Sequence, residues 1–231
     1  MQKNWTVADP ISEEFRNKFP EIDRVILQLL HNRDIKTQKQ IDEFMNPDWG
    51  EDVHDPFLFQ DMKKAVKRIF LAIEKKESIV VYGDYDADGV CSSVILNDAL
   101  KALGAQNVHV HLPHRETEGY GLNIPAVKEL IKKKTDLVIT CDCGTSNVEE
   151  VALAKEKGID VIITDHHHEP DRLPQPYAFI NPKLSKEAYP FKTLAGGGVA
   201  FKLVQALVIE DAKRDKILPE GFDKWLLDLV A

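Results

Sequence analysis

Residues 78–93 read SIVVYGDYDADGVCSS, and the rest of the chain is organised around them. The segment begins with an apolar, β-branched run, residues 79–82, which predicts a buried strand. Three carboxylates follow within five residues, at Asp84, Asp86 and Asp88, and the chain then enters an apolar, helix-like segment. Because ligands of open α/β sheets bind at the carboxyl ends of strands, we expect a functional site here.

The spacing of these carboxylates favours a bound cation. Residues two apart in an extended chain face the same side, so the pattern predicts that all three converge. Ionised carboxylates this close repel one another unless a cation lies among them. The alternative is a solvated acidic turn in which Asp88 caps the following helix.

Composition excludes several classes of protein. The chain has 231 residues, 43% of them hydrophobic, enough for one large domain or for one domain with a subdomain. The net charge of −8 argues against a basic surface over the whole chain but allows a local basic groove. We find neither a membrane span nor a signal peptide. The three cysteines form no C-x-x-C pair, which favours small core residues in a reducing, cytoplasmic compartment over a zinc site.

Residues 1–76 are predicted to form a helical amino-terminal region packed on the core. Apolar residues recur at helical spacing in residues 20–32, 37–45 and 61–76. The last of these carries four cations that we interpret as a solvated face rather than a DNA contact: Lys63, Lys64, Lys67 and Arg68. We assign no chemistry to this region.

From residue 77 the pattern alternates between strand and helix. Short apolar strands are expected at 79–82, 108–112, 136–140, 161–164 and 177–180, and helices at 90–103, 123–134, 148–157, 199–212 and 222–230. This alternation predicts an α/β fold in which helices cover both faces of a parallel sheet. The chain stops inside an apolar run, so we expect the domain at 77–231 to be truncated.

Three predicted strands end in candidate metal ligands. Besides the first acidic cluster, Asp142 follows the strand at 136–140, and the run from Asp165 to His168 follows the strand at 161–164. Carboxylates and imidazoles without thiolates suit manganese or magnesium, with zinc as an alternative. This many acids indicates two ions, the arrangement used for in-line displacement at phosphorus. In an extended chain Asp142 would point away from the cysteines on either side of it.

Two further segments are candidates for substrate contacts. Arg115 could bind a phosphate and Tyr120 could stack on a base, although a charged loop without function explains them equally well. Gly197 and Gly198 open the helix predicted at 199–212, where backbone N–H groups can approach a phosphate. A glycine-rich turn alone is weak evidence.

The segments GDYDADG, CDCGTSN, TDHH and LAGGGVAFKL, in this order, resemble the DHH phosphoesterase family. Within that family the chain is most similar to the RecJ group of bacterial single-stranded-DNA exonucleases, and DPFLFQDM in the amino-terminal region resembles the same group. The resemblance covers nearly the whole chain.

The resemblance implies a ligand set for two Mn²⁺ or Mg²⁺ ions. It matches Asp86 and Asp88 to the paired metal ligands, with Asp84 beside them, and Asp142 to a bridging ligand. His166 matches the imidazole ligand, His167 matches the histidine that faces the phosphate, and Asp228 matches the last metal ligand. Tyr82 replaces a histidine common in relatives, which would weaken one ion or leave part of its coordination to water.

The function implied is a metal-dependent 5′→3′ exonuclease that releases 5′-mononucleotides from single-stranded DNA in repair and recombination. Single-strand-binding protein and a helicase are candidate partners, and no membrane is involved. Alternatives are a DHH phosphodiesterase for short oligonucleotides or cyclic dinucleotides, and a non-catalytic replication scaffold. Relatives continue into further DNA-holding domains, so we expect this chain to be weak or inactive alone.

Overall fold

The computed structural model describes residues 6–230, and its contacts divide the chain into two units, the second of which begins at Asp55. The first unit contains helices α1 (Glu13–Lys18), α2 (Arg24–His31) and α3 (Gln38–Met45) around a small core. Thr37 caps α3 through a capping box with Gln40, so the predicted start of this helix is confirmed.

The second unit is built on a five-stranded sheet, all of it parallel, in the order β2-β1-β3-β4-β5. The strands are β1 (Ile79–Tyr82), β2 (Val108–His111), β3 (Leu137–Cys141), β4 (Asp160–Thr164) and β5 (Ala178–Ile180). The helices are η1 (Pro56–Leu58), α4 (Met62–Glu74), α5 (Ala87–Ala102), α6 (Ile124–Lys132), α7 (Val148–Glu156), α8 (Gly196–Asp211), α9 (Phe222–Trp225) and η2 (Leu227–Leu229).

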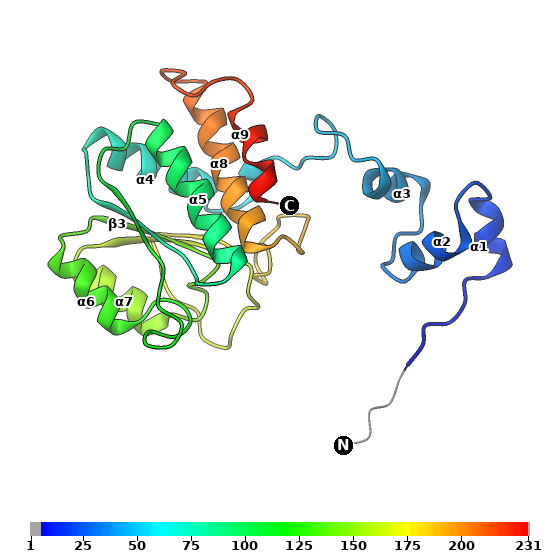
Figure 1. Cartoon of the computed structure of the whole chain (residues 1–231), viewed down its shortest axis with the longest axis horizontal. Coiled ribbons are helices and arrows are strands. Elements are labelled where there is room, and N and C mark those ends of the chain that lie inside the picture. Colours follow the sequence, from blue (N-terminus) through cyan, green and yellow to red (C-terminus); the bar gives the residue numbers. More distant parts are fainter. Residues whose placement is uncertain (1–5, 231) are drawn as a thin grey trace. The chain divides into compact units, whose positions relative to one another are not determined.

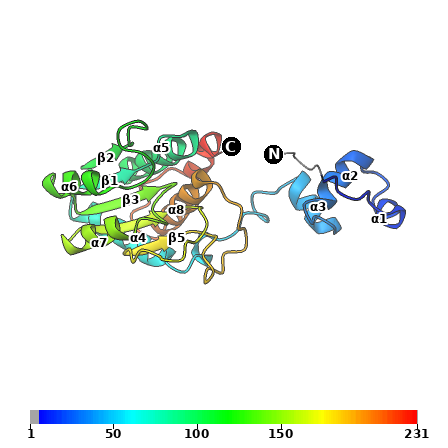
Figure 2. The same ribbon diagram turned by 90° about the horizontal axis from the view of Figure 1, so that it is seen from below.

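Helices cover both faces of the sheet, as predicted. Helices α4, α5 and α8 lie on one face, and α6 and α7 lie on the other (Figures 1 and 2). All residues of β1 and β3 are buried, as expected for central strands of a parallel sheet. The α/β class is therefore confirmed.

Helix α4 packs within the second unit. It contacts α8 and β5, and the Arg68 Nε donates to Asp160 Oδ2 over 2.6 Å. The division after His54 thus lies upstream of the domain boundary predicted at residue 76.

The last predicted helix is not continuous. Helix α9 ends at Trp225, Leu226 intervenes, and the 3-10 turn η2 follows. Apolar periodicity indicated a helix but could not show this break.

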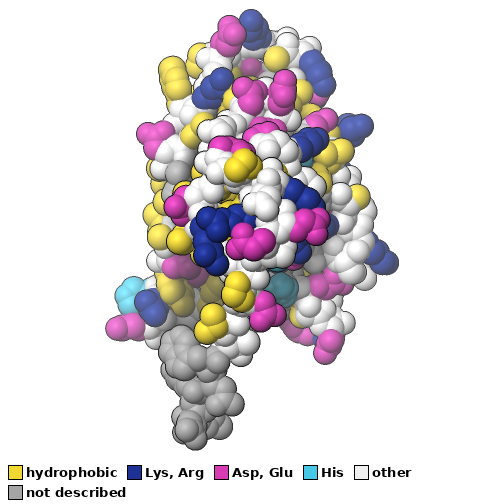
Figure 3. Space-filling view, turned by 90° about the vertical axis from the view of Figure 1, so that its right-hand side faces the viewer, with side chains coloured by type: hydrophobic (Ala, Val, Ile, Leu, Met, Phe, Trp, Pro, Cys, Tyr) yellow, Lys and Arg dark blue, Asp and Glu magenta, His cyan; other side chains and the backbone are white. Residues whose placement is uncertain are grey.

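On the face shown in Figure 3, Lys and Arg side chains are interspersed with Asp and Glu. Within residues 6–230, no helix combines the length and apolar content that crossing a bilayer requires.

One buried cation on α8 makes stability depend on pH. Lys202 is 6% exposed and donates to Gln205 Oε1 over 2.8 Å. Burial lowers its pKa to about 8, against the opposing effect of Asp55 and Asp223. Between that pKa and the ordinary value of 10.5, the unfolded chain binds more protons than the folded one, so stability contributed by this site rises with pH.

We therefore expect the free energy of unfolding of the wild type to rise relative to that of Lys202→Met between pH 7 and pH 10.5. The expected gain is about 3 kcal/mol. Urea unfolding of both proteins across this range measures it. Parallel pH profiles would contradict the prediction.

Candidate metal centre

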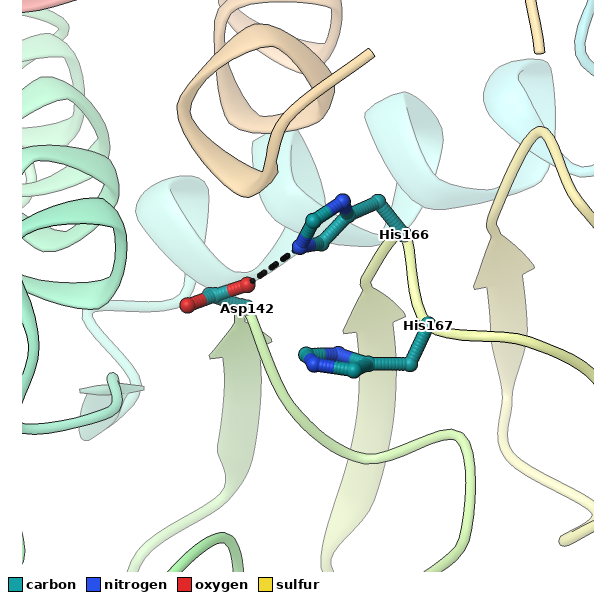
Figure 4. A group of neighbouring side chains, drawn as sticks. All are labelled: Asp142, His166 and His167. Atoms are coloured by element: carbon teal, nitrogen blue, oxygen red, sulfur yellow. Dashed lines mark ion pairs between the residues drawn. The ribbon is translucent and has the colours of Figure 1, made fainter. Parts of the chain in front are cut away.

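The carboxyl ends of β1, β3 and β4 lie side by side, because these strands are neighbours in a parallel sheet. Figure 4 shows the imidazoles of His166 and His167 after β4 pointing toward Asp142 at the end of β3. The convergence of groups from separate strands, expected from the sequence, is thus observed for these residues.

Asp142 is the centre of the group. Its carboxylate is 2% exposed, and Oδ1 lies 3.0 Å from His166 Nε2. The residue has a φ of 59°, so the backbone is left-handed and not extended as predicted. The neighbouring Cys141 and Cys143 are nevertheless buried free thiols, separate from the ligand groups.

Burial and like charge act on the carboxylates in this group. Burial raises the pKa of Asp142, and the nearby carboxylates of Asp88 and Asp86 raise it further, whereas His166 opposes the change. Burial also raises the pKa of Asp84. The Asp142 carboxylate in turn raises the pKa of His166. Such a site favours a bound cation, because a cation would offset both the burial of the carboxylates and the repulsion between them.

The first acidic cluster does not converge through an extended chain. Asp86 caps α5 by accepting a hydrogen bond from the N–H of Gly89, whereas Asp88 lies within the first helical turn. The alternative in which Asp88 is the cap is therefore wrong. β1 has ended before these residues: Asp84 lies in the loop after the strand, Asp86 is extended at the cap, and only Asp88 has helical backbone.

Asp88 binds the glycine-rich start of α8. Its carboxylate accepts hydrogen bonds from the N–H of Gly196 over 2.7 Å and from the N–H of Gly197 over 2.6 Å. A helix N-terminus attracts anions, and here the chain supplies the anion itself. The phosphate contacts expected of Gly197 and Gly198 stay predictions, and the N–H of Gly197 already has a partner.

The donor set fits a divalent cation. Within residues 6–230, two groups offer ligand atoms that lie within 4.8 Å of one another: Asp84, Asp86 and Asp142, and Asp142, His166 and His167. Among the described residues, Oδ1 of Asp84 is a buried carboxylate oxygen without a hydrogen-bond partner. Burying such an atom is costly unless something binds it. Carboxylate oxygens with imidazole nitrogens suit Mn²⁺ or Mg²⁺.

Asp165 supports the centre by orienting His167. Its Oδ1 lies 2.7 Å from His167 Nδ1, and its carboxylate accepts hydrogen bonds from the backbone N–H groups of His166 and Thr145. Burial alone would raise the pKa of Asp165, but hydrogen bonds from His167 and Thr145 outweigh it and hold the pKa low. Sequence reasoning placed Asp165 among the candidate ligands and missed this supporting role.

Tyr120 comes to the same edge from the loop before α6. Its hydroxyl donates to the carbonyl oxygen of Asp142 over 3.2 Å and lies 3.0 Å from His167 Nδ1. Arg115, in the same loop, is exposed and lies over the ring of Tyr85, with its guanidinium carbon 5.3 Å from the ring centroid. The structure thus brings Tyr120 to the site, while Arg115 remains a candidate for a nucleotide contact.

Asp228 lies on η2, is exposed and belongs to neither ligand group among the described residues. The carbonyl oxygen of Leu229 lies 3.8 Å from the position that a Cβ would take at Gly197, which places η2 close to the start of α8 and to Asp88. Its role as a ligand stays a prediction.

Tyr82 reaches a different part of the unit from the ligands. Its hydroxyl donates to the carbonyl oxygen of Gly121 over 3.2 Å, and its ring stacks on His111. Tyr82 is thus bonded to Gly121, the residue next to Tyr120 in the loop that reaches the site.

We expect Tyr82→Phe to lower the free energy of unfolding by about 1 kcal/mol, since it leaves the buried Gly121 carbonyl without its partner. Mn²⁺ affinity should not change, because Tyr82 is not in a ligand group. Thermal unfolding and calorimetric titration measure the two effects. Weaker Mn²⁺ binding with unchanged stability would give Tyr82 the metal role instead.

The comparisons with known proteins agree with this geometry. Residues 78–231 match the family model described as "DHH family, N-terminal domain". The chain belongs to the DHH family. It is 40% identical over 229 residues to the single-stranded-DNA-specific exonuclease RecJ of Bacillus subtilis, covering 98% of this chain and 28% of that protein. RecJ of Haemophilus influenzae is 38% identical over 224 residues, covering 96% of this chain and 37% of that protein.

Among solved structures, RecJ of Thermus thermophilus in complex with Mn²⁺ has a TM-score of 0.69 and 26% identity, covering 94% of this DHH-family chain and 29% of that one. The chain therefore spans about a third of the length of these relatives. DHH-family membership and fold follow from the match, while the activity of a whole relative is a separate matter.

Proposed function

We propose that this chain is the metal-binding, catalytic part of a 5′→3′ single-stranded-DNA exonuclease that releases 5′-mononucleotides. The observation that carries the proposal is the group of Asp84, Asp86, Asp142, His166 and His167 at one edge of the parallel sheet. Similarity to exonucleases that act on single-stranded DNA supports the substrate.

Each residue of the site has a role in this proposal. The residues that would hold two Mn²⁺ or Mg²⁺ ions are Asp84, Asp86, Asp88, Asp142, His166 and Asp228. Bound ions would make water more acidic and neutralise charge on the phosphodiester. Asp165 orients His167, so that a protonated imidazole can donate to a non-bridging phosphate oxygen. Tyr120 and Arg115 would contact the nucleotide.

The wider setting is proposed on the same basis. A nuclease of this kind would act in DNA repair and recombination in the cytoplasm. Single-strand-binding protein and a helicase are candidate partners, because such an enzyme needs a single strand that has been exposed and kept open.

Hydrolysis of single-stranded DNA labelled at its 5′ end tests the activity. With Mn²⁺ the chain should release labelled mononucleotides, slowly if further domains are needed to hold the strand. Asp142→Asn is the matched negative control. Internal cleavage, or hydrolysis that persists in EDTA, would contradict the proposal.

A further inference from the structure

A second feature lies away from the metal centre, in a groove between α4, η1 and the end of α8. Its volume is ≈ 400 Å³, which is within the range of ligand-binding clefts. Four of its lining side chains are cations: Lys63, Lys67, Lys213 and Arg214. We call this the basic groove.

Two of the four cations contact aromatic rings. The Arg214 guanidinium lies 4.4 Å from the Phe70 ring centroid and is fixed by Glu74 and Glu210, at 2.9 Å and 3.1 Å. The Lys213 ammonium lies 5.7 Å from the centroid of the Phe57 ring, which lines the groove. The groove is therefore a local basic site in a chain of net charge −8.

Two lysines extend the site along α4. Lys63 and Lys67 are exposed and lie one helical turn apart, so their side chains share a face. Among the residues that the structure describes, Glu210 is the one acidic residue of the lining, and it is paired with Arg214 over 3.1 Å and with Lys213 over 4.0 Å. Cations beside an aromatic ring are the combination that binds the backbone and a base of single-stranded nucleic acid.

We propose that the basic groove binds the phosphate backbone of single-stranded DNA at a distance from the metal centre, with Phe57 available to a base. This rests on the proposed function, which supplies the substrate class. Helix α8 connects the two sites: its first residue, Gly196, binds Asp88, and its last turn reaches the groove. At a rise of 1.5 Å per residue, the length of α8 separates the two sites by roughly 20 Å. Only a DNA strand longer than this distance can contact both sites.

Binding of fluorescent oligothymidylate to this chain in EDTA, followed by anisotropy over a range of salt concentrations, tests the groove. The variant is Lys63→Gln/Lys67→Gln/Lys213→Gln. The matched control is Lys128→Gln/Lys132→Gln/Lys133→Gln, which removes three exposed cations on and just after α6, on the opposite face of the sheet.

For a strand of about 20 nucleotides, the variant should lower the slope of log K against log salt by about 2, since each lost phosphate contact removes about 0.7. The control should keep the wild-type slope. Equal slopes for wild type and variant would overturn the proposal. So would an acidic peptide that binds the groove while the lysine variant keeps its affinity for DNA.

The two proposals can fail separately. DNA binding to the groove is measured without metal and without cleavage. If the chain lacks nuclease activity but wild type and variant differ in salt slope, the proposed function fails and the groove proposal stands. If the chain cleaves DNA but the two slopes are equal, only the groove proposal fails.

Discussion

Replacing Asp142 with asparagine should abolish Mn²⁺ binding and lower phosphodiester hydrolysis by about 10³-fold. Asp142 is the one residue common to both ligand groups found among the described residues, so its loss affects every ion held there. Asparagine tolerates the left-handed φ of 59°, so the backbone should keep its path. The substitution also removes a buried negative charge, so the metal-free variant should be at least as stable as the wild type.

Thermal unfolding with and without Mn²⁺ separates binding from folding. Mn²⁺ should raise the melting temperature of the wild type, because a ligand that binds only the folded state stabilises it, and should not raise that of Asp142→Asn. The exposed Asp171→Asn, outside both ligand groups, is the control. Wild-type Mn²⁺ affinity in Asp142→Asn would refute the ligand assignment.

Gly196→Ala should lower Mn²⁺ affinity at least about tenfold, an effect of the size that follows from disturbing the support of a metal ligand. A Cβ at this position would lie 2.6 Å from Oδ1 of Asp142 and 2.7 Å from its Cβ, so the carboxylate would have to move. The backbone N–H of Gly196 also holds Asp88. The methyl group therefore disturbs two of the proposed ligands at once.

Gly198→Ala is the matched control, two residues further along the same helix. Its Cβ would meet the Cδ2 of Leu194 at 3.0 Å, and that methyl group is the end of a flexible side chain. Both substitutions replace a helical glycine with alanine, and alanine is about 1 kcal/mol more favourable than glycine inside a helix. Calorimetric titration of both variants with Mn²⁺ should show a lower affinity only for Gly196→Ala. Equal affinities would mean that the position of Asp142 tolerates the methyl group.

The order of strands and helices could be predicted because the strands are short, most of them are apolar, and most are followed by a segment with apolar residues at helical spacing; β2, VHVH, is the least apolar of them. The common edge of the sheet followed from parallel pairing, which predicted correctly that Asp142 and His166 lie together. Asp228 entered the predicted ligand set only through the resemblance, because a lone acid in an apolar segment gives no signal of its own.

The local geometry could not be predicted in the same way. The contact of Asp88 with Gly196 joins residues 108 apart in the chain, and no local pattern reports it. The backbone at Asp142 is left-handed, and α5 starts at Ala87 with Asp86 as its cap. Sequence spacing alone treated both segments as extended.

Calorimetric titration of this chain with Mn²⁺ tests the central claim most directly, namely that the carboxylates and imidazoles at this edge form a metal centre. We predict saturable binding of two ions per chain, competed by Mg²⁺ and lost in Asp142→Asn. Absence of saturable binding in the folded wild-type chain would contradict the assignment.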